Sequence, residues 1–287
     1  MSTTPTFFSL HGVDGAPFDP QTVWREKEST GLLTIPIGVD PEGSPVVLAF
    51  TRWPSLDDHV AVVGAPGAGT TTVLRTIMLS LSLSLSLSLS RSADLINFLV
   101  AEGKAGGQEY ADAPELPHCI GHVTFTRDQT ARLAGRLADA LGCEVDRREE
   151  LLRTAGAANL DDYRQDLKLR SDIEPLPDTL VILDDTRLRP GFDAALQSLI
   201  ARGHRLGIRL VVGIPYPQWQ TLSRSGVSDG FSARVTVGLS KPQSSSVLAA
   251  DVPGDATTAG HGCVTHLGGE PVRVAALAAV TAIPALR

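Results

Sequence analysis

Cysteines and long apolar runs are scarce in this sequence. Its three cysteines, Cys119, Cys143 and Cys263, are too few and too scattered for a disulfide framework, so reduced thiols in the cytosol are expected. The uncharged run Thr76–Ser90 has fifteen residues, six of them Ser, and is too short and too polar to span a membrane. The first ten residues lack the basic region and apolar stretch of a secretory signal. These absences indicate a cytoplasmic protein.

Positive charge is also in short supply. The 287 residues carry 25 Lys and Arg against 32 Asp and Glu, a net charge of −7, and the pI is near 5.5. This balance argues against a surface that coats nucleic acid. Hydrophobic residues make up 43% of the chain and charged residues 20%, which excludes a mainly disordered chain. The length fits one large domain, or one domain with a small satellite.

The pattern along the chain indicates an α/β domain. Residues 1–30 hold several Pro and Gly and are interpreted as an irregular N-terminal arm. Residues 31–50 hold two apolar runs around Asp40-Pro-Glu-Gly43, which predicts a β-hairpin. Short apolar runs typical of buried strands then alternate with helix-length segments, and the runs span residues 59–63, 96–100, 179–183, 209–212 and 234–237. Residues 31–287 are therefore predicted to form one domain with a mostly parallel sheet and helices on both faces.

A long helix is predicted after Thr126. Thr126 and Gln129 have the spacing of a capping box, and Gly156 follows the last turn. An apolar stripe recurs every four residues between these points, at Leu133, Leu137, Leu141 and Val145. The charged residues of this segment are left mainly on the solvent side, namely Arg132, Arg136, Asp139, Asp146 and Arg147.

Six Leu-Ser pairs run from Leu79 to Ser90. Strict alternation favours an amphipathic strand, but the pairs continue a segment that follows a glycine-rich turn, where an α/β unit places a helix. We therefore expect a helix through about Ser84 and a repeat-derived extension beyond it. Sequence slippage without a function is the alternative reading of such a tract.

The glycine-rich turn has the spacing of a phosphate-binding loop. It follows the strand at 59–63 and consists of Gly64, Ala65, Pro66, Gly67, Ala68, Gly69, Thr70, Thr71 and Thr72. Glycines at both ends let backbone N–H groups turn inward around phosphate oxygens, and the following helix points its positive end at the same anion. Thr71 stands where a hydroxyl binds Mg²⁺.

Thr70 occupies the position where a phosphate loop carries Lys. A threonine hydroxyl donates a hydrogen bond but brings no charge to the β- and γ-phosphates. Charge-assisted hydrogen bonds contribute about 1.5–3 kcal/mol against about 1 kcal/mol for neutral ones, so nucleotide should bind weakly. The alternative is a strand-to-helix turn that holds no ligand.

Two carboxylates follow a second apolar strand. Residues 179–183 end at Asp184 and Asp185, where Asp184 suits a hold on Mg²⁺ at the carboxyl end of the strand. Asp185 stands where ATPases of this build usually carry a Glu that orients the attacking water, and Asp is shorter by one methylene. A solvated strand end is the alternative for both residues.

With the hairpin, loop and acidic strand in place, the chain resembles the FtsK/SpoIIIE family of P-loop motor ATPases. It is most similar to the ATPase domains of the EccC component of type VII secretion. The matching segments span residues 33–47, 102–107, 116–124, 144–164 and 201–212. The resemblance covers nearly the whole chain and implies a RecA-like fold, ATP and Mg²⁺ as cofactors, and other secretion-motor subunits or small secreted helical proteins as partners, in homo- or hetero-oligomers.

The chain departs from the family pattern at three catalytic elements. Thr70 replaces the loop Lys, and Asp185 replaces the usual Glu. The sensor stretch, ordinarily Ala-Thr-Gln-Arg-Pro, is replaced by residues 213–217 (GIPYP), which lack its Gln and Arg. The resemblance therefore implies a degenerate ATPase domain that binds nucleotide weakly and hydrolyses it little. Attachment to a membrane is expected only through the secretion complex.

Arg202 and Arg205 lie near the end of a predicted helix. They are candidates for arginine fingers that act across a subunit interface. Basic residues at such a place more often interact with the helix end itself.

Two further groups of residues have a structural alternative. A shared zinc site is conceivable for His118, Cys119, His122, His261, Cys263 and His266, but their spacing matches no known ligand pair, so a structural role is favoured. A groove for a partner peptide is conceivable for Phe7, Phe8, Trp24, Trp53 and Trp219. Scattered aromatic residues are more often part of the core.

Three functions thus compete on the sequence. The favoured one is a degenerate nucleotide-binding domain of a secretion motor that recognises protein partners. The second is an active ATP-driven translocase of DNA or protein, against which Thr70 and the net charge of −7 count. The third is a protein-interaction module with a vestigial phosphate loop, against which the retained glycines and Asp184 count.

Overall fold

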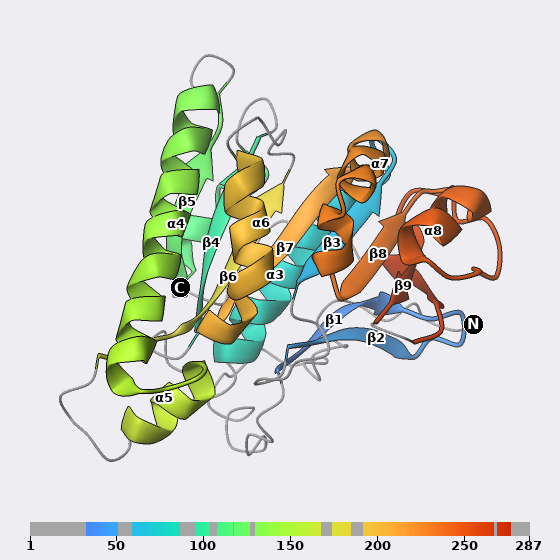
Figure 1. The fold of residues 1–287 in the computed structure, drawn as a ribbon. Coiled ribbons are helices and arrows are strands. Elements are labelled where there is room, and N and C mark those ends of the chain that lie inside the picture. Colours follow the sequence, from blue (N-terminus) through green and yellow to red (C-terminus); the bar gives the residue numbers. More distant parts are fainter. Residues whose placement is uncertain are drawn as a thin grey trace. The chain divides into compact units, whose positions relative to one another are not determined.

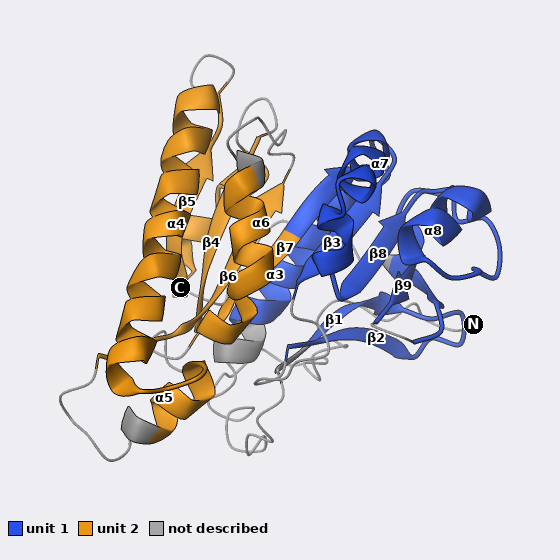
Figure 2. Ribbon diagram, viewed as in Figure 1, with its two compact units in different colours: residues 1–51, 55–91, 212–287 blue, residues 52–54, 92–211 orange. Residues whose placement is uncertain are grey.

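A computed structural model describes most of the chain. The described residues are 33–50, 59–86, 96–103, 108–116, 118–126, 130–167, 174–184, 192–266 and 269–276. The predicted N-terminal arm, Asp185, Trp24 and Trp53 lie outside them. The chain divides into two compact units (Figure 2): unit 1 comprises residues 1–51, 55–91 and 212–287, and unit 2 comprises residues 52–54 and 92–211.

Unit 1 contains a mixed sheet (Figure 1). Its strand order is β2 (Pro45–Phe50), β1 (Leu33–Val39), β10 (Val272–Ala276), β9 (His261–Thr265), β8 (Ala233–Val237) and β3 (Val60–Gly64). Strands β3 and β8 run parallel, and the other pairs in this row are antiparallel. All five residues of β3 are buried, as expected for a strand covered on both faces.

Strands β1 and β2 form the predicted hairpin. They pair from Leu33↔Phe50 to Val39↔Pro45, and the turn is closed by the Ser44 N–H, which donates to the Asp40 carboxylate at 2.7 Å. The hairpin joins the sheet through β10, a strand from the far end of the chain, which pairs with β1 at Gly38↔Ala276. Neither β9 nor β10 was predicted from the sequence.

The Leu-Ser tract is helical as far as Ser86. Helix α3 spans Thr70–Ser86 and packs on β1 and β3, which confirms the expected helix and rules out a strand at these residues. Ser80 and Ser82 are as fully buried as Leu81, and the Ser80 hydroxyl donates to the Pro36 carbonyl at 3.3 Å. Residues 87–90 lie outside the described part.

Helical segments complete the described part of unit 1. They are α7 (Tyr216–Arg224), the 3₁₀ turn η3 (Val227–Gly230) and α8 (Lys241–Leu248). Trp219 of α7 is 1% exposed; its ring packs against Phe231 and under the Arg234 guanidinium. Trp219 is therefore a core residue. Among the described helices, none is long and apolar enough to cross a membrane.

Unit 2 contains parallel strands. Strand β4 (Ile96–Glu102) lies between β6 (Asp178–Asp184) and the edge strand β5 (Cys119–Thr124). Strand β7 (Ile208–Pro215) is divided between the two units at residue 211. The helical elements of unit 2 are η1 (Ala113–Glu115), α4 (Thr130–Ala155), α5 (Leu160–Leu167), α6 (Phe192–Arg202) and η2 (His204–Leu206).

Helix α4 is the long helix that the sequence predicted. Leu137, Leu141 and Val145 of the apolar stripe are buried, whereas Leu133 is half-buried. The five charged residues assigned to the solvent side are all exposed. Gly156 follows with φ +74°, the left-handed conformation that commonly ends a helix. Helix α4 begins at Thr130, and most of the predicted capping box lies outside the described residues.

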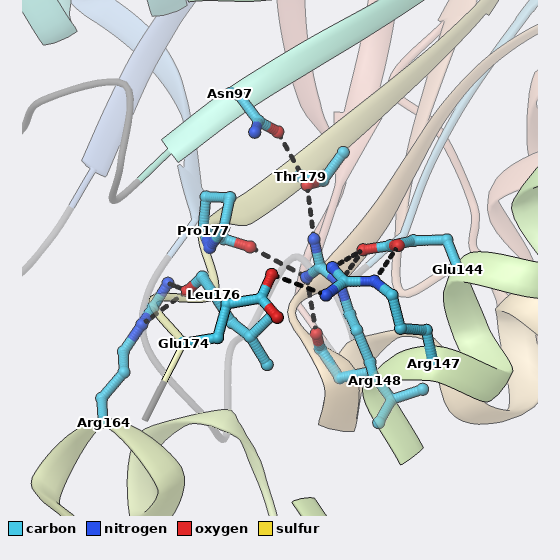
Figure 3. Close-up of polar contacts among 10 residues, drawn as sticks. Asn97, Glu144, Arg147, Arg148, Arg164, Glu174, Leu176, Pro177 and Thr179 are labelled. Atoms are coloured by element: carbon cyan, nitrogen blue, oxygen red, sulfur yellow. Dashed lines mark hydrogen bonds and ion pairs between the residues drawn. The ribbon is translucent and has the colours of Figure 1, made fainter. Parts of the chain in front are cut away.

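Arg148 lies on the same buried face of α4 as the apolar stripe, although it is a cation. Only 2% of it is exposed, and its guanidinium donates to the Glu144 carboxylate, to the Pro177 and Leu206 carbonyls and to the Thr179 hydroxyl, at 2.7–2.9 Å (Figure 3). Burial lowers the pKa of Arg148, and Glu144 opposes this effect. Arg148 thereby fastens α4 to the amino-terminal end of β6.

Asp178, the first residue of β6, binds two further guanidinium groups. Arg164 of α5 and Arg209 of β7 contact its two carboxylate oxygens at 2.7 and 2.6 Å. Burial raises the pKa of Asp178, but the charges and hydrogen bonds of Arg209 and Arg164 outweigh burial, and the pKa lies below its usual value. The amino-terminal ends of the unit 2 strands are thus held by charged side chains.

The structure confirms the α/β class. The five strands predicted from the apolar runs are present as β3, β4, β6, β7 and β8. Strand β3 pairs in parallel with β8, and β4 pairs in parallel with β6. The sheet becomes antiparallel where β9, β10 and the hairpin extend it in unit 1. The limits of the predicted domain remain a prediction.

Candidate functional site: the phosphate loop

The phosphate loop of unit 1 leaves β3 at Gly64 and enters α3 at Thr70. Gly67 and Gly69 have φ of +74° and +109°, conformations that favour glycine. A Cβ at Gly64 would overlap the Thr70 hydroxyl oxygen, whereas a Cβ at Gly67 would meet no atom within 4 Å. The glycines are therefore needed for the turn itself, and there is open space beside Gly67.

Two segments outside the motif hold this loop in place. The Gly260 N–H donates to the Ala68 carbonyl at 2.8 Å, and the Ala65 N–H donates to the Val237 carbonyl at 3.2 Å. Gly238, which follows β8 with φ +65°, lies so close to Ala68 that a Cβ at Gly238 would overlap the Ala68 Cβ. Gly238 and Gly260 could not be recognised from the sequence, because neither belongs to the motif or lies near it in the chain.

The start of α3 has the features that an anion needs. Its first helical bond runs from the Val73 N–H to the Gly69 carbonyl at 3.0 Å, which leaves the earlier N–H groups at the positive end of a 17-residue helix. The Thr71 side chain is almost fully buried. No charged side chain occurs between Gly64 and Thr72.

Asp184 ends β6 in unit 2 and is 2% exposed. Its carboxylate accepts a hydrogen bond from the Tyr110 hydroxyl at 3.1 Å, and its carbonyl accepts one from the Gly103 N–H at 2.8 Å. These contacts fix a carboxylate at the carboxyl end of the strand, as predicted. Thr71 belongs to unit 1 and Asp184 to unit 2, and the expected short distance between them remains a prediction. The second carboxylate, Asp185, lies outside the described residues.

Glu102, which is in register with Asp184 on β4, is a buried carboxylate that the sequence analysis did not single out as a site residue. It binds the His122 ring at 2.7 Å and accepts a hydrogen bond from the Thr124 hydroxyl at 3.3 Å. Its position directly after the apolar run of β4 was the sequence feature that could have indicated a buried carboxylate at the end of the strand. The ends of β4 and β5 are therefore joined by polar side chains, whereas the Asp184 carboxylate at the end of β6 binds Tyr110.

The altered sensor stretch spans the end of β7 and the start of α7. Ile214 is buried, Pro215 lies at the helix cap, and the Tyr216 hydroxyl accepts a weak hydrogen bond from Gln220 at 3.5 Å. The side chains of residues 213–217 carry no charge and no amide that would contact a phosphate in place of the missing Gln and Arg.

Arg202 and Arg205 are held within unit 2. Arg202 contacts Glu149 and Asp146 of α4 at 3.0 and 3.5 Å, and Arg205 contacts Glu149 at 2.7 Å. Both guanidinium groups therefore link α6 and η2 to α4. This geometry favours a structural role over an arginine finger.

The six His and Cys residues considered for zinc do not form a metal site. Within the described ranges, which include all six, no group of three or more His, Cys, Asp or Glu residues is placed to hold a metal ion. His122 is bound to Glu102, and the Cys119 thiol donates to the Gly121 carbonyl at 3.5 Å. Burial raises the pKa of the Cys119 and Cys263 thiols, which keeps them protonated.

A separate pocket of about 290 Å³ lies in unit 1 at the tip of the β1–β2 hairpin. Its lining includes Asp40, Asp255 and Arg273 together with Thr258 and His261. The last two belong to the turn that carries Gly260, so one side of this turn contacts the phosphate loop and the other side lines the pocket.

The geometry of the observed loop fits a phosphate group. The left-handed glycines, the open space at Gly67 and the helix start suit an anion. Thr71 and Asp184 are the residue types that hold Mg²⁺, directly or through water. The chain offers no cation within the loop to neutralise charge that develops during phosphoryl transfer.

Comparison with known proteins identifies the family. The FtsK/SpoIIIE family model matches residues 20–265. The chain belongs to the FtsK/SpoIIIE family. This FtsK/SpoIIIE domain is 30% identical to the ESX-4 secretion system protein EccC4 of Mycobacterium tuberculosis over 206 residues, which cover 69% of the chain and 16% of EccC4.

Solved structures agree with this assignment. The cytoplasmic domain of the type VII secretion ATPase EccC of Thermomonospora curvata has a TM-score of 0.79 and 25% identity, over 98% of the FtsK/SpoIIIE domain and 33% of that chain. A structure of ATPases 2 and 3 of the same protein in complex with a signal sequence peptide has a TM-score of 0.68 and 20% identity, over 99% and 49%. The fold is therefore that of RecA-like P-loop ATPases, and the chain spans about one sixth of the length of EccC4.

Proposed function

We propose that this chain is a degenerate ATP-binding domain of a type VII protein secretion motor, which binds nucleotide weakly and hydrolyses it little. The observation that carries the proposal is the phosphate loop, which keeps its glycines, its left-handed turns and its helix start while Thr70 replaces the lysine. Similarity to EccC proteins supports the cellular role.

The nucleotide would be held through its phosphates by backbone N–H groups. Gly69 and Thr70 would supply such donors, whereas the Ala68 N–H donates to the Ala65 carbonyl, and the start of α3 adds its positive end. Thr71 and Asp184 would hold Mg²⁺, which supplies charge neutralisation at the β- and γ-phosphates when it is bound. Asp184→Asn should then remove most of the Mg²⁺ dependence of ADP binding and leave Mg²⁺-free binding unchanged.

Hydrolysis is expected to be very slow because three elements are altered together. Thr70 brings no charge to the phosphates, Asp185 is shorter than the usual Glu, and the sensor residues at 215–216 offer neither amide nor guanidinium. Purified protein should turn over ATP more slowly than about 1 s⁻¹, the low end for ordinary enzymes. A faster rate would favour the alternative of an active translocase.

Direct titration separates binding from a vestigial loop. ATP and ADP are titrated into the protein by calorimetry with and without Mg²⁺, and saturable heat is expected at high micromolar to millimolar nucleotide. Absence of heat from ATP and ADP at millimolar concentration would reject nucleotide binding and leave the protein-interaction module.

The partners would be other ATPase domains or subunits of the motor and small secreted helical proteins. The T. curvata protein is known in complex with a signal sequence peptide, and the net charge of −7 does not favour DNA. The chain would work on the cytoplasmic side, in contact with the membrane only through its partners. A fluorescent signal sequence peptide should bind saturably in anisotropy measurements, and a peptide of the same composition in scrambled order should not.

A further inference from the structure

Gly260 and Gly238 contact the phosphate loop from outside its motif, and together they determine how its peptide groups point. In a planar trans peptide, the C=O of one residue and the N–H of the next point in opposite directions. The Ala68 carbonyl accepts the Gly260 N–H at 2.8 Å. The Gly69 N–H, in the same peptide group as that carbonyl, must therefore point away from Gly260.

The next peptide group is fixed in the same way. The Gly69 carbonyl accepts the Val73 N–H at 3.0 Å, so the Thr70 N–H points away from the body of the helix. Neither the Gly69 nor the Thr70 N–H donates to any acceptor in the part of the chain that the structure describes. Two backbone donors are thus directed outward, available to an anion.

Gly238 makes this arrangement sterically possible. It has φ +65°, and a Cβ there would overlap the Ala68 Cβ. Its own N–H donates to the His261 carbonyl at 2.9 Å, which links it to the residue that follows Gly260. The missing side chain at Gly238 therefore lets Ala68 come close enough for the Gly260 bond.

We propose that Gly238 and Gly260 are positioning residues of the nucleotide site: they hold the Ala68–Gly69 peptide group in its phosphate-binding orientation before nucleotide arrives. This inference rests on the proposed function. A loop that is ordered in advance loses less conformational entropy on binding. This preorganisation offsets part of the affinity that the loop loses through Thr70.

The test compares two glycine substitutions with the same backbone cost. Gly238→Ala and Gly226→Ala both place Ala in a left-handed conformation, with φ +65° and +76°, but a Cβ at Gly226 meets no atom within 4 Å. Gly226→Ala is therefore the matched control. Gly238→Ala should weaken ADP binding at least about tenfold in calorimetry, while Gly226→Ala should change it less than twofold. Thermal stability should fall in both, and further in Gly238→Ala, because only that Cβ meets Ala68.

A compensating substitution tests the contact itself. Ala68→Gly removes the atom that a Cβ at residue 238 would meet, so the double variant Gly238→Ala with Ala68→Gly should recover most of the lost affinity. Equal affinity of Gly238→Ala and wild type, or an equal loss in Gly226→Ala, would overturn the proposal.

Hydrogen exchange separates this inference from the proposed function. Without nucleotide, the Gly260 amide should exchange slowly in the wild type and in Gly226→Ala, and at least about tenfold faster in Gly238→Ala. This result is expected even if the wild type gives no heat with ATP. In that case nucleotide binding would be rejected, but the positioning of the Ala68–Gly69 peptide group by Gly238 and Gly260 would be supported. Fast exchange of the Gly260 amide in the wild type would contradict the proposed positioning role, whatever the nucleotide affinity.

Discussion

The phosphate loop of unit 1 and the amino-terminal strand ends of unit 2 are held by different kinds of interaction. The loop depends on backbone hydrogen bonds and on glycines at close contacts, and it contains no charged side chain. The strand ends depend on the guanidinium groups of Arg148, Arg164 and Arg209, each bound to carboxylates or carbonyls. Charge is thus missing where phosphoryl transfer would need it and retained where packing needs it.

The largest effect is expected at Arg148. Arg148→Ala leaves the Pro177 and Leu206 carbonyls without this donor and removes one of the two guanidinium partners of Glu144, so the free energy of unfolding should fall by about 3–5 kcal/mol. Urea unfolding measures it. Arg153→Ala is the control, because Arg153 forms an exposed pair with Glu150 on the same helix. A loss at Arg148 no larger than that of the control would show that charge does not hold these strand ends.

Asp178→Asn should have the next largest effect. It should lower the free energy of unfolding by about 3 kcal/mol at neutral pH, because Arg164 and Arg209 lose their shared carboxylate. The pKa of Asp178 is lowered in the folded state. Its contribution is therefore complete above about pH 4, the ordinary pKa of Asp, and is lost as the pH falls below that value.

Urea unfolding at neutral pH and at about pH 3 should thus show a difference between wild type and Asp178→Asn that shrinks on acidification. Asp139→Asn, on the exposed face of α4, serves as the control. A difference that is independent of pH would rule out the charge as its cause.

Thr70→Lys would give the phosphate loop the charged side chain that it lacks. The new ammonium group would meet phosphate oxygens that the backbone already binds, so ATP should bind about 1–3 kcal/mol more tightly, roughly five- to a hundredfold. Calorimetry on both proteins measures this. Hydrolysis should rise less, because Asp185 and residues 213–217 remain altered. An unchanged affinity would show that the loop does not present its donors to phosphate.

The smallest effect is expected at Arg205. Arg205→Ala removes a half-exposed ion pair with Glu149, so stability should fall by less than about 1 kcal/mol. ATP turnover in a coupled assay should remain at the wild-type level. A marked drop in turnover with unchanged stability would restore the arginine-finger reading.

Local sequence patterns predicted the parts of the fold that depend on local interactions. Fully apolar runs predicted the buried strands β3, β4, β6, β7 and β8, and the four-residue stripe predicted α4. Strands β9 and β10 were missed because their short segments contain His, Gly and Arg, and they are strands through pairing with distant residues. The pairing of β10 with β1 brings the two ends of the described chain together, which no local pattern indicates.

The site was predicted to a similar extent. The motif spacing predicted the loop, and the position after β6 predicted a fixed carboxylate at Asp184. The bracing glycines, Gly238 and Gly260, could not be predicted because their role arises from a contact across nearly 200 residues of sequence. Arg148 lies seven residues after Leu141, on the apolar stripe, and this position indicated that it would be buried. The burial was not predicted because Arg is usually a surface residue.

The burial of α3 limits how its repetitive segment can vary in evolution. Each added Leu-Ser pair rotates the following residues by about 200° around the helix axis. A pair inserted before Ser82 would therefore turn the rest of α3 off its present packing, since Leu79, Leu81 and the serines between and after them are all buried. Pairs gained or lost after Ser86 would not rotate any of these buried residues. Length variation among relatives should accordingly be confined to the end of the tract.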